Sequence, residues 1–506
     1  MPEDVAVPLS DSELTRFRAL QASLAETWPY MTTGRVGDAP RTLVVINSMN
    51  LELPAHMYPV VPAYEERFLF LMLAAVKNPG TRVIYVTSQP ILPRLVHYYM
   101  SLMPGSHPSG LEERVQLVSA GDGSARPLID KILERPLLVQ RLKALAATSP
   151  FRVLFPFNTT PKEVLLGNLL DTPVYGPDPT LAYLGSKSGS RQAFAEAGVQ
   201  HPSGAEGVFG IDDVIGALEN LRVANPGLKA AMVKLDDLAG GLGNALVRLE
   251  GVDSKASLRR RVAELEVEDQ EGTSEEFLAA LARRGGIVEE RIEGEDIRSP
   301  SVQLRANPLR QVEVLSTHDQ VLGGATGQTF LGCTFPADSG YGAQIAELGA
   351  EIGQHLANQG VIGRFGIDFV VVKQNCEWRP YAIEINLRNG GTTHPMRTLG
   401  ALTDGEFDPT SNTFPVDGGE RFYVATDHLE DDSYRALTTD DVLDRVGDLR
   451  LAWNEETKTG IALHLVSAVA VAGRLGVTAV GTSHQDAEDR FRSAGQVITE
   501  RAATGL

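Results

Sequence analysis

The sequence predicts a multidomain protein of mixed α/β and α+β class. With 506 residues, the chain is too long for one ordinary hydrophobic core, and its length indicates roughly three domains. Strand-like and helical stretches alternate in the first part of the chain, which favours a parallel sheet. After the turn-rich stretch TPVYGPDPT, Thr172–Thr180, the pattern becomes α+β, so we expect a domain boundary near residue 180.

The N-terminal domain, residues 1–180, should be built on a parallel sheet. Helical stretches, for example Ala63–Val76 and Pro127–Ala147, separate its short apolar runs, and a further helix, Asp11–Leu24, precedes them. Strands that alternate with helices pair in parallel, because each helix carries the chain back to the same end of the sheet. The four apolar runs are Thr42–Ile46, Arg82–Thr87, Val115–Ser119 and Arg152–Phe155.

The rest of the chain should form two central lobes, residues 181–300 and 301–419, and a small α+β domain, residues 420–506. In the first lobe we expect helices at Ser188–Gly198, Asp212–Asn220 and Ser254–Glu266 and strands at Ala230–Leu235, Asn244–Leu249 and Gly286–Ile292. In the second lobe we expect strands at Ser301–Arg305, Gln311–Thr317, Gly363–Lys373 and Trp378–Arg388 and a helix at Ala343–Asn358. The last domain contains the apolar segments Ala462–Ala470 and Gly476–Gly481 and a final helix that begins near Thr482 or Ser483.

Charge and composition exclude several classes of partner. The net charge of −19 repels nucleic acid and anionic membranes, so we expect neither as a partner. No apolar run approaches the ~18–20 residues of a membrane helix, and the N-terminus lacks the basic-then-apolar order of a secretory signal. Two cysteines, Cys333 and Cys376, do not make a disulfide framework. A cytoplasmic protein fits these features best.

The most informative stretch is a predicted β-hairpin with the strands GRFGIDFVVV and RPYAIEINLRNGG, Gly363–Val372 and Arg379–Gly391. Side chains alternate between the two faces of a strand, so Glu384, Asn386 and Arg388 share one face and an apolar set shares the other. If the hairpin is symmetric about Cys376, Asp368 lies directly across from Glu384, with Cβ atoms about 4.5–5.5 Å apart.

Two carboxylates at this distance repel each other unless a cation binds between them. Asp368, Glu384 and Asn386 offer the hard oxygen ligands that Mg²⁺ takes, which predicts a magnesium site. The alternative is a solvent-exposed strand face that carries ordinary polar residues.

A glycine-rich loop joins two predicted strands in AAMVKLDDLAGGLGNALVRL, Ala230–Leu249. Gly240, Gly241 and Gly243 give the loop backbone the freedom to fold over phosphates and to donate N–H groups to them. Because a strand and not a helix follows, the loop is a flap between antiparallel strands rather than a dinucleotide fingerprint. Lys234 stands in the apolar strand before the flap, where its ammonium needs an anion, unless the strand is an edge strand and the lysine faces water.

These motifs, in this order, resemble the ATP-grasp superfamily over residues 181–395. The order is a lysine before a helix, a V-x-K strand, a glycine flap, the segment IVEERIEGED and then D…E-x-N-x-R. The resemblance implies Mg²⁺ and ATP as cofactors. Two departures are visible: Asp296 stands where a glutamate is usual, and the first lysine lacks the common preceding acid.

The resemblance also implies roles for single residues. It makes Lys187 and Lys234 the two phosphate-contacting lysines, Gly240–Asn244 the flap, with Gly240, Gly241, Gly243 and Asn244 binding ATP, and Asp368, Glu384 and Asn386 the metal ligands. It places Glu289 near adenine, Arg291 and Ile292 at the hinge backbone and Asp296 at the ribose, and it adds Glu290 to the ATP-binding residues. Arg388 is then the arginine that contacts the transferred phosphoryl group or the acyl phosphate.

The whole chain resembles more specifically the pheganomycin-type peptide ligases. The stretches that carry this likeness are Val44–Pro54, Gly324–Pro336 and Gly460–Ser483. The resemblance implies a pre-ATP-grasp domain, an ATP-grasp domain and a short C-terminal domain. It also implies a peptide ligase of antibiotic biosynthesis that joins a small-molecule carboxylate to an amine or peptide through an acyl phosphate, with release of ADP and phosphate.

Several questions stay open at this point. Arg364 shares the face of Asp368 and is a further catalytic candidate, as is Arg305 in SVQLRA, although salt bridges are the plainer explanation for both. His318 and His394 are more typical of structural histidines. The acceptor can instead be a carrier thiol or an amino sugar, or the chain can be a non-catalytic nucleotide-binding regulator. The absence of a glycine fingerprint after Ile46 weakens an oxidoreductase. A homodimer is possible.

Overall fold

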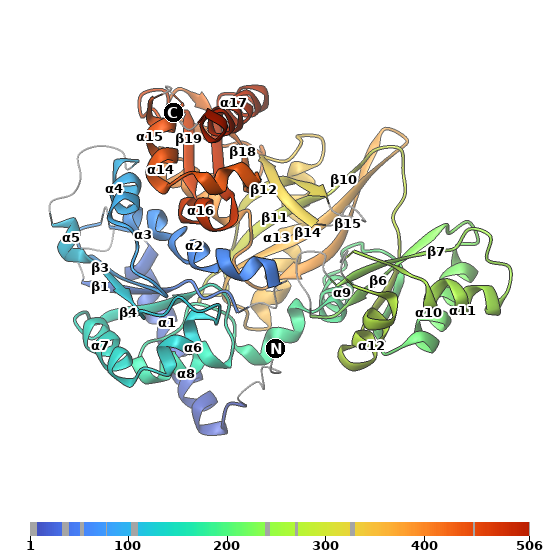
Figure 1. Ribbon diagram of the computed structural model, residues 1–506. Helices are drawn as coiled ribbons and strands as arrows, with labels where there is room; N and C mark the ends of the chain where they lie inside the picture. Colours follow the sequence, from blue (N-terminus) through green and yellow to red (C-terminus); the bar gives the residue numbers. More distant parts are fainter. Residues whose placement is uncertain are drawn as a thin grey trace.

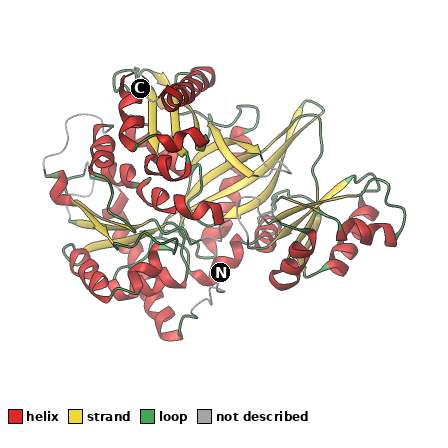
Figure 2. Cartoon of the chain, in the orientation of Figure 1, coloured by secondary structure: helices red, strands yellow, loops and turns green. Residues whose placement is uncertain are grey.

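The structure is a computed structural model that describes residues 8–32, 40–50, 55–76, 78–102, 110–237, 243–268, 272–323, 329–448 and 451–504 (Figure 1). Three large sheets, flanked by helices, organise these residues (Figure 2). The mixed α/β and α+β class expected from the sequence is confirmed. No helix of the described part is long and apolar enough to cross a membrane.

The N-terminal part contains a four-stranded sheet in the order β3-β2-β1-β4, and all three pairings are parallel. Its strands are β1 (Arg41–Ile46), β2 (Thr81–Thr87), β3 (Val115–Ser119) and β4 (Phe151–Pro156), within one residue of the expected bounds. The helices of this part are α1 (Asp11–Thr32), α2 (Val61–Glu66), α3 (Leu69–Ala75), α4 (Pro93–Ser101), α5 (Leu111–Arg114), α6 (Leu128–Leu133), α7 (Pro136–Ala146) and α8 (Pro161–Leu170).

Two helices expected as single elements are each divided in two. The stretch Pro127–Ala147 forms α6 and α7, and the second begins at Pro136, which has no N–H to continue the first. The stretch Ala63–Val76 forms α2 and α3, which are separated at Arg67 and Phe68. At this break the side chain of Arg67 reaches Asp427, far along the chain.

The first central lobe is a five-stranded antiparallel sheet in the order β5-β9-β6-β7-β8. Its strands are β5 (Gly204–Val208), β6 (Ala230–Leu235), β7 (Asn244–Arg248), β8 (Glu266–Val267) and β9 (Gly286–Glu290), and its helices are α10 (Ile211–Ala224), α11 (Lys255–Ala263) and α12 (Ser274–Arg284). Helix α9 (Lys187–Glu196) precedes this sheet and packs Phe194 into the core of the second lobe. In Figure 1 the lobe stands to one side of the molecule, in green.

The second lobe and the tail share one nine-stranded sheet in the order β10-β14-β11-β12-β13-β18-β20-β19, with β15 paired to β14. Its strands are β10 (Ile297–Arg298), β11 (Pro300–Ala306), β12 (Val312–Gly323), β13 (Thr329–Phe335), β14 (Gly363–Gln374), β15 (Glu377–Asn386), β18 (Phe422–Glu430), β19 (Gly460–His464) and β20 (Arg474–Gly481). Its helices are α13 (Gly342–Asn358), α14 (Thr393–Thr403), α15 (Thr439–Asp448), α16 (Val469–Ala472) and α17 (His484–Thr504). One sheet therefore spans residue 420, where we expected a domain boundary, because β13 of the second lobe pairs with β18 of the tail. The boundary stays a prediction.

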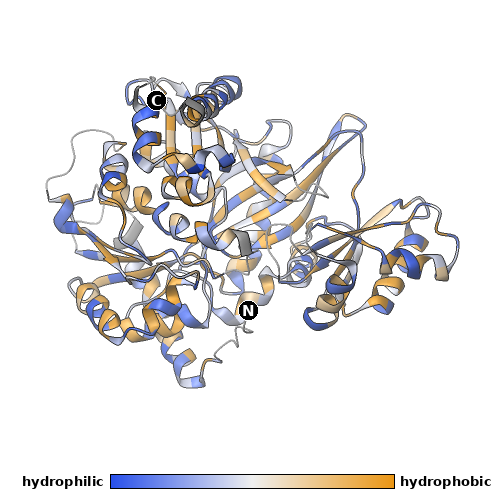
Figure 3. Ribbon diagram, in the orientation of Figure 1, coloured by the Kyte–Doolittle hydropathy of each residue, from blue (hydrophilic) through white to orange (hydrophobic). Residues whose placement is uncertain are grey.

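The N-terminal domain packs against the tail through a shared hydrophobic core. Leu69 and Tyr85 of the N-terminal part belong to the same buried cluster as Leu463 and Val477 of β19 and β20. Figure 3 shows these tail strands in the hydrophobic colours, whereas α17 is largely hydrophilic. The two ends of the chain therefore form one structural unit beside the two central lobes.

Candidate active site

The predicted carboxylate hairpin exists, and Asp368 of β14 pairs with Glu384 of β15. The turn residues are Asn375 and Cys376, both with positive φ. A regular hairpin on this two-residue turn would set Ile383, not Glu384, opposite Asp368. A β-bulge between Asp368 and Phe369 in the pairing shifts the register by one residue and brings Glu384 to the position across from Asp368. The expected pairing is therefore confirmed, but a bulge and not simple symmetry produces it.

Amide donors surround the carboxylate of Asp368. The Gln320 side chain on β12 donates to its Oδ1 at 3.0 Å, and the Asn386 amide donates to its Oδ2 at 2.9 Å. Arg388 in turn donates to the Asn386 Oδ1 at 2.9 Å. Burial and the negative charge of Glu384 raise the pKa of Asp368 to about 7, although Arg388 and Lys187 oppose the shift. A carboxylate held in this way gains from a nearby cation.

Lys187 reaches the carboxylate pair from the start of helix α9. Ser186 caps this helix by accepting a hydrogen bond from the Gly189 N–H at 3.0 Å, which fixes the first turn. The Lys187 ammonium contacts the Glu384 carboxylate in a partly buried ion pair. Asp236, at the end of β6, accepts from the Ser188 N–H at 2.8 Å and so ties the helix start to the first lobe.

Lys234 faces a carboxylate rather than water. It is 4% exposed on β6, and its ammonium lies 2.5 Å from Glu289 on the adjacent strand β9. Arg191 of α9 contacts the other oxygen of Glu289 at 3.3 Å. The edge-strand alternative for Lys234 is therefore wrong, because β6 lies between β7 and β9.

The segment after β9 connects the two lobes. Glu290 accepts from the Ser203 N–H at 2.9 Å, and the Arg291 N–H donates to the Ala230 carbonyl at 3.2 Å. Ile292 is half-buried. Asp296 pairs with Arg298 at 3.1 Å, and its carbonyl accepts from the Lys373 N–H on β14 at 3.0 Å. The expected hinge and ribose residues thus lie along one path between the lobes.

The structure describes only part of the expected flap. Gly240 and Gly241 lie outside the described residues. The carbonyl of Gly243 accepts from the Leu235 N–H at 2.8 Å, and Asn244 pairs with Lys234 across the β6–β7 ladder. Strands β6 and β7 therefore place the base of the flap next to Lys234.

Arg305 and Arg364 stand opposite each other on β11 and β14. Arg305 forms the expected salt bridge, with Glu313 of β12. Arg364 forms none with any residue in the described ranges, and its Nη1 is buried without an acceptor there. The salt-bridge explanation therefore suits Arg305 and does not suit Arg364.

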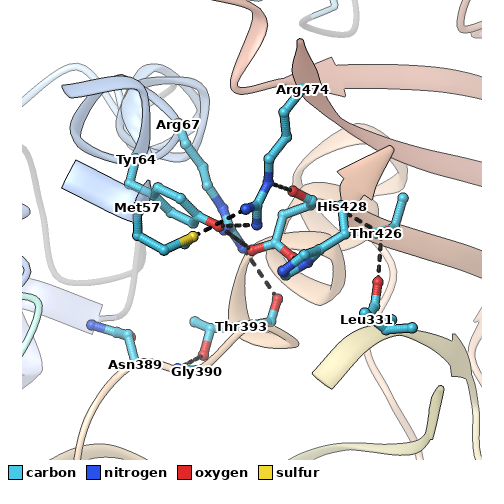
Figure 4. Close-up of polar contacts among 12 residues, drawn as sticks. Met57, Tyr64, Arg67, Leu331, Asn389, Gly390, Thr393, Thr426, His428 and Arg474 are labelled. Carbon is cyan, nitrogen blue, oxygen red and sulfur yellow. Dashed lines mark hydrogen bonds and ion pairs between the residues drawn. The ribbon is translucent and has the colours of Figure 1, made fainter. Parts of the chain in front are cut away.

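The loop after the hairpin is held by the N-terminal domain and the tail (Figure 4). Arg67 donates to the Gly391 carbonyl and to the Asp427 carboxylate, both at 3.1 Å. The Thr393 hydroxyl accepts from the Gly390 N–H at 2.9 Å. A narrow pocket at this place is lined by Arg67, Phe330, Cys333, Gly391, Pro395, Ala425, Thr426, Asp427 and His464.

The two histidines considered as bases are deeply buried. His318 contacts the Tyr423 hydroxyl at 2.5 Å, and burial lowers its pKa to about 3. His394 packs against His464 with ring centroids 4.2 Å apart. Both surroundings suit structural histidines.

The residues at the hairpin fit a magnesium ion with nucleotide phosphates. Asp368, Glu384 and Asn386 supply oxygen atoms on one face. Burial and the charge of Glu384 raise the pKa of Asp368, so a cation bound here would stabilise its charged form. Within the described residues no group of three or more His, Cys, Asp and Glu side chains forms a cage for an ion. A site with two carboxylates and one amide leaves coordination positions for phosphate oxygens and water, as Mg²⁺ prefers.

Sequence reasoning missed the partners that come from distant elements. Gln320, Arg191 and Asp236 contact Asp368, Glu289 and the start of α9, respectively. Each makes its contact with a residue 48 or more positions away in the sequence, so no local pattern marks it.

The fold and the site define an ATP-grasp enzyme. The sequence matches the family described as IQCH-like, ATP-grasp at residues 179–273 and 258–410, and the PGM1 C-terminal domain at residues 441–494. Two solved structures share the fold. N5-carboxyaminoimidazole ribonucleotide synthetase in its ADP complex has a TM-score of 0.52 and 12% identity, covering 94% of this chain and 100% of that one. Biotin carboxylase of Campylobacter jejuni has a TM-score of 0.54 and 13% identity, covering 92% and 95%.

The chain belongs to the ATP-grasp ligases. It is 31% identical over 434 residues to L-propargylglycine–L-glutamate ligase of Streptantibioticus cattleyicolor, a match that spans 84% of this chain and 88% of the relative. The resemblance inferred from the sequence is thus confirmed.

Proposed function

We propose that this ATP-grasp ligase joins a carboxylate to an amine through an acyl phosphate, with release of ADP and phosphate. The observation that carries the proposal is the convergence of Asp368, Glu384 and Asn386 with Lys187 and Arg388 on one face of the hairpin. Carboxylates, an ammonium and a guanidinium in one place suit the positioning and charge stabilisation that phosphoryl transfer requires.

Each residue has a definite task in this scheme. Asp368, Glu384 and Asn386 would hold Mg²⁺, which offsets negative charge on the ATP phosphates. Lys187 and Lys234 bind phosphate oxygens once their carboxylate partners turn to the metal and the nucleotide. Phosphate contacts are assigned to Gly240, Gly241, Gly243 and Asn244, and nucleoside binding to Glu289, Glu290, Arg291, Ile292 and Asp296.

The chemistry proceeds in two steps. A substrate carboxylate oxygen attacks the γ-phosphorus of ATP, and the bond to the β-phosphate oxygen breaks to release ADP. The amine nitrogen then attacks the acyl carbon, phosphate leaves with the C–O bond electrons, and the nitrogen loses a proton to water. Arg388 stabilises the oxyanion of the tetrahedral intermediate.

The named relative suggests the first substrates to try. L-propargylglycine and L-glutamate are printed in its name, and propargylglycine is not a standard amino acid. This relation supports a place for the chain in the biosynthesis of peptide natural products.

The test is a chromatographic assay of nucleotides and products. The protein is incubated with Mg-ATP, L-glutamate and L-propargylglycine, and then with pools of amino acids and short peptides. We expect ADP and phosphate to form only with substrate, together with a product whose mass equals the two substrates minus water. AMP and pyrophosphate would contradict the acyl phosphate, and a thioester or an amino-sugar amide would redefine the acceptor.

A further inference from the structure

A cluster of three arginines lies at the end of β14 that faces the N-terminal domain. Arg364 and Arg305 are directly paired across β14 and β11. Arg397 of α14 is close enough for its charge, with that of Arg305, to add to burial in lowering the pKa of Arg364. Trp28 lies 5.8 Å from the Arg305 guanidinium, and its ring stacks on Tyr175 at 4.9 Å. Three cations and two aromatic rings therefore enclose one place.

The positive charge of this cluster is poorly balanced. Among the described residues Glu313 pairs with Arg305 alone, and the Glu313 side chain is 44% exposed. Over the part of the chain that the structure describes, Arg364 and Arg397 have no ion-pair partner, and the buried Nη1 of Arg364 and Nε of Arg305 have no acceptor. Like charges directly across a strand pair repel each other. A chain with a net charge of −19 has many acids available, yet none of the described ones meets Arg364.

The position of the cluster along β14 identifies what it faces. Lys373, near the far end of the strand, bonds to the Asp296 backbone at 3.0 Å, where the ribose is expected. Asp368 stands between that end and Arg364, on the same face as Arg364. At about 3.3 Å per residue, Arg364 lies ~13 Å beyond Asp368 along the strand. An ATP molecule that runs from Asp296 to Asp368 therefore points its γ-phosphate toward the arginines, so the anion missing there belongs to the substrate.

Gly366 lies between Asp368 and Arg364 on β14, directly across from Gln303 of β11. A Cβ atom added at Gly366 would lie 2.8 Å from the Gln303 side-chain nitrogen, so a side chain here would meet Gln303. The Gln303 side chain therefore covers the strand face between the metal ligands and the arginines, and glycine at position 366 leaves room for it. The spacing of ~13 Å between Asp368 and Arg364 suits an amino acid or a dipeptide rather than a second nucleotide.

We propose that Arg364, with Arg305 and Arg397, binds a carboxylate of an amino-acid substrate that is not activated in the reaction. This inference rests on the proposed function. Two guanidinium N–H groups of one arginine bind a carboxylate in bidentate fashion, and the aromatic wall of Trp28 and Tyr175 keeps water from weakening the contact. The N-terminal domain thus supplies one wall of the substrate site.

The carboxylate can come from the donor, as a second acid group, or from the acceptor, as its α-carboxylate. Calorimetry in the presence of Mg-ADP distinguishes the two sources. L-glutamate is compared with its α-amide and its side-chain amide, and L-propargylglycine is compared with L-propargylglycinamide. In the wild type we expect one of these acids to bind at least tenfold more tightly than its amide. In Arg364→Gln that preference should disappear, because the group that recognises the charge is gone.

A matched control comes from the same hairpin. Arg379 is an exposed arginine near the turn end of β15, so Arg379→Gln removes one charge without touching the cluster. This variant should keep the full preference for the acid over the amide. Arg364→Lys should retain part of it. Two results would overturn the proposal. In one, Arg364→Gln still binds an acid more tightly than its amide; in the other, the wild type binds no acid more tightly than its amide.

A second measurement needs no substrate. If the charge of Arg364 is balanced by a substrate anion alone, replacing Arg364 in the ligand-free protein removes its repulsion with Arg305 and Arg397. Arg364→Gln should therefore melt at a higher temperature than the ligand-free wild type. A lower melting temperature would mean that Arg364 stabilises the fold, and the proposal would fail. Mg-ADP titration of the wild type reports on the nucleotide site separately, so a failure of the proposed ligase function is recognised independently of the arginines.

Discussion

Asp368 and Glu384 place two negative charges across one strand pair, and different neighbours compensate them. Glu384 pairs with Lys187, whereas Asp368 receives hydrogen bonds from Gln320 and Asn386. Strand alternation was sufficient to predict which residues share this face. The bulge that brings the two carboxylates together and the contact from Gln320 depend on tertiary packing, and no local pattern in the sequence reveals them.

Glu384→Gln should lower the rate of ADP formation by about 100-fold or more, because the amide removes the negative charge that a magnesium ion and the lysine both need. The measurement is substrate-dependent ADP release at saturating Mg-ATP. Glu377→Gln, an exposed change on the same strand, is the control and should leave the rate unchanged. A Glu384→Gln enzyme within about tenfold of wild type, roughly 1.4 kcal/mol, would remove Glu384 from the proposed metal site.

Lys234→Met should weaken the binding of Mg-ADP by about tenfold or more. It should also lower stability, since among the described residues the buried Glu289 then keeps Arg191 as its sole cationic partner. Calorimetric titration with Mg-ADP measures the first effect and urea denaturation the second. Unchanged nucleotide affinity together with lost stability would make the Lys234–Glu289 pair purely structural.

At the scale of elements, the strands were predicted well and several connections were not. β1, β2 and β6 are short, apolar and bounded by polar turns, so the local pattern suffices. The break between α2 and α3 has no proline or glycine to mark it. At this break Arg67 contacts Asp427, and because the two residues are far apart in the sequence, no local pattern predicts the contact.

Glu66, at the end of α2, should make stability depend on pH. It is 5% exposed, accepts from the Ser467 N–H at 3.2 Å, and has its pKa raised to about 7, first by burial and also by Glu65. Because the unfolded chain releases this proton at lower pH, the folded protein loses stability as pH rises from about 4.5 to about 7.

Glu66→Gln removes this titration and keeps the acceptor for Ser467. The variant should be more stable than the wild type at pH 8, by about 1–3 kcal/mol, and should match it near pH 4.5. Urea denaturation over this range measures the difference. Two stability curves that stay parallel across the range would show that Glu66 does not titrate as described.

At the scale of the whole molecule, a buried ion pair joins the N-terminal domain to the tail. Arg67 and Asp427 have side chains only 4% and 9% exposed. Arg67→Ala should cost about 3–5 kcal/mol of stability, because it leaves Asp427 buried with less positive charge nearby.

Arg94→Ala provides the control for Arg67→Ala. Arg94 joins the same two parts of the chain, α4 and α15, but its side chain is 54% exposed. Its loss should cost less than about 1 kcal/mol. Equal losses of stability for the two variants, measured by urea denaturation, would contradict the distinction between buried and exposed pairs.

In the continuous nine-stranded sheet, the tail strands cover the edge of β13. Strand β13 pairs with β18 through Cys333, Thr334 and Phe335. In a chain cut before β18, β13 would become an edge strand whose backbone N–H and C=O groups have lost their partners. The side chains of Cys333 and Phe335, which are buried in the intact protein, lie on this strand. Such an edge invites pairing with another chain. The tail thus covers the sheet, and its removal should produce aggregation rather than a smaller working enzyme.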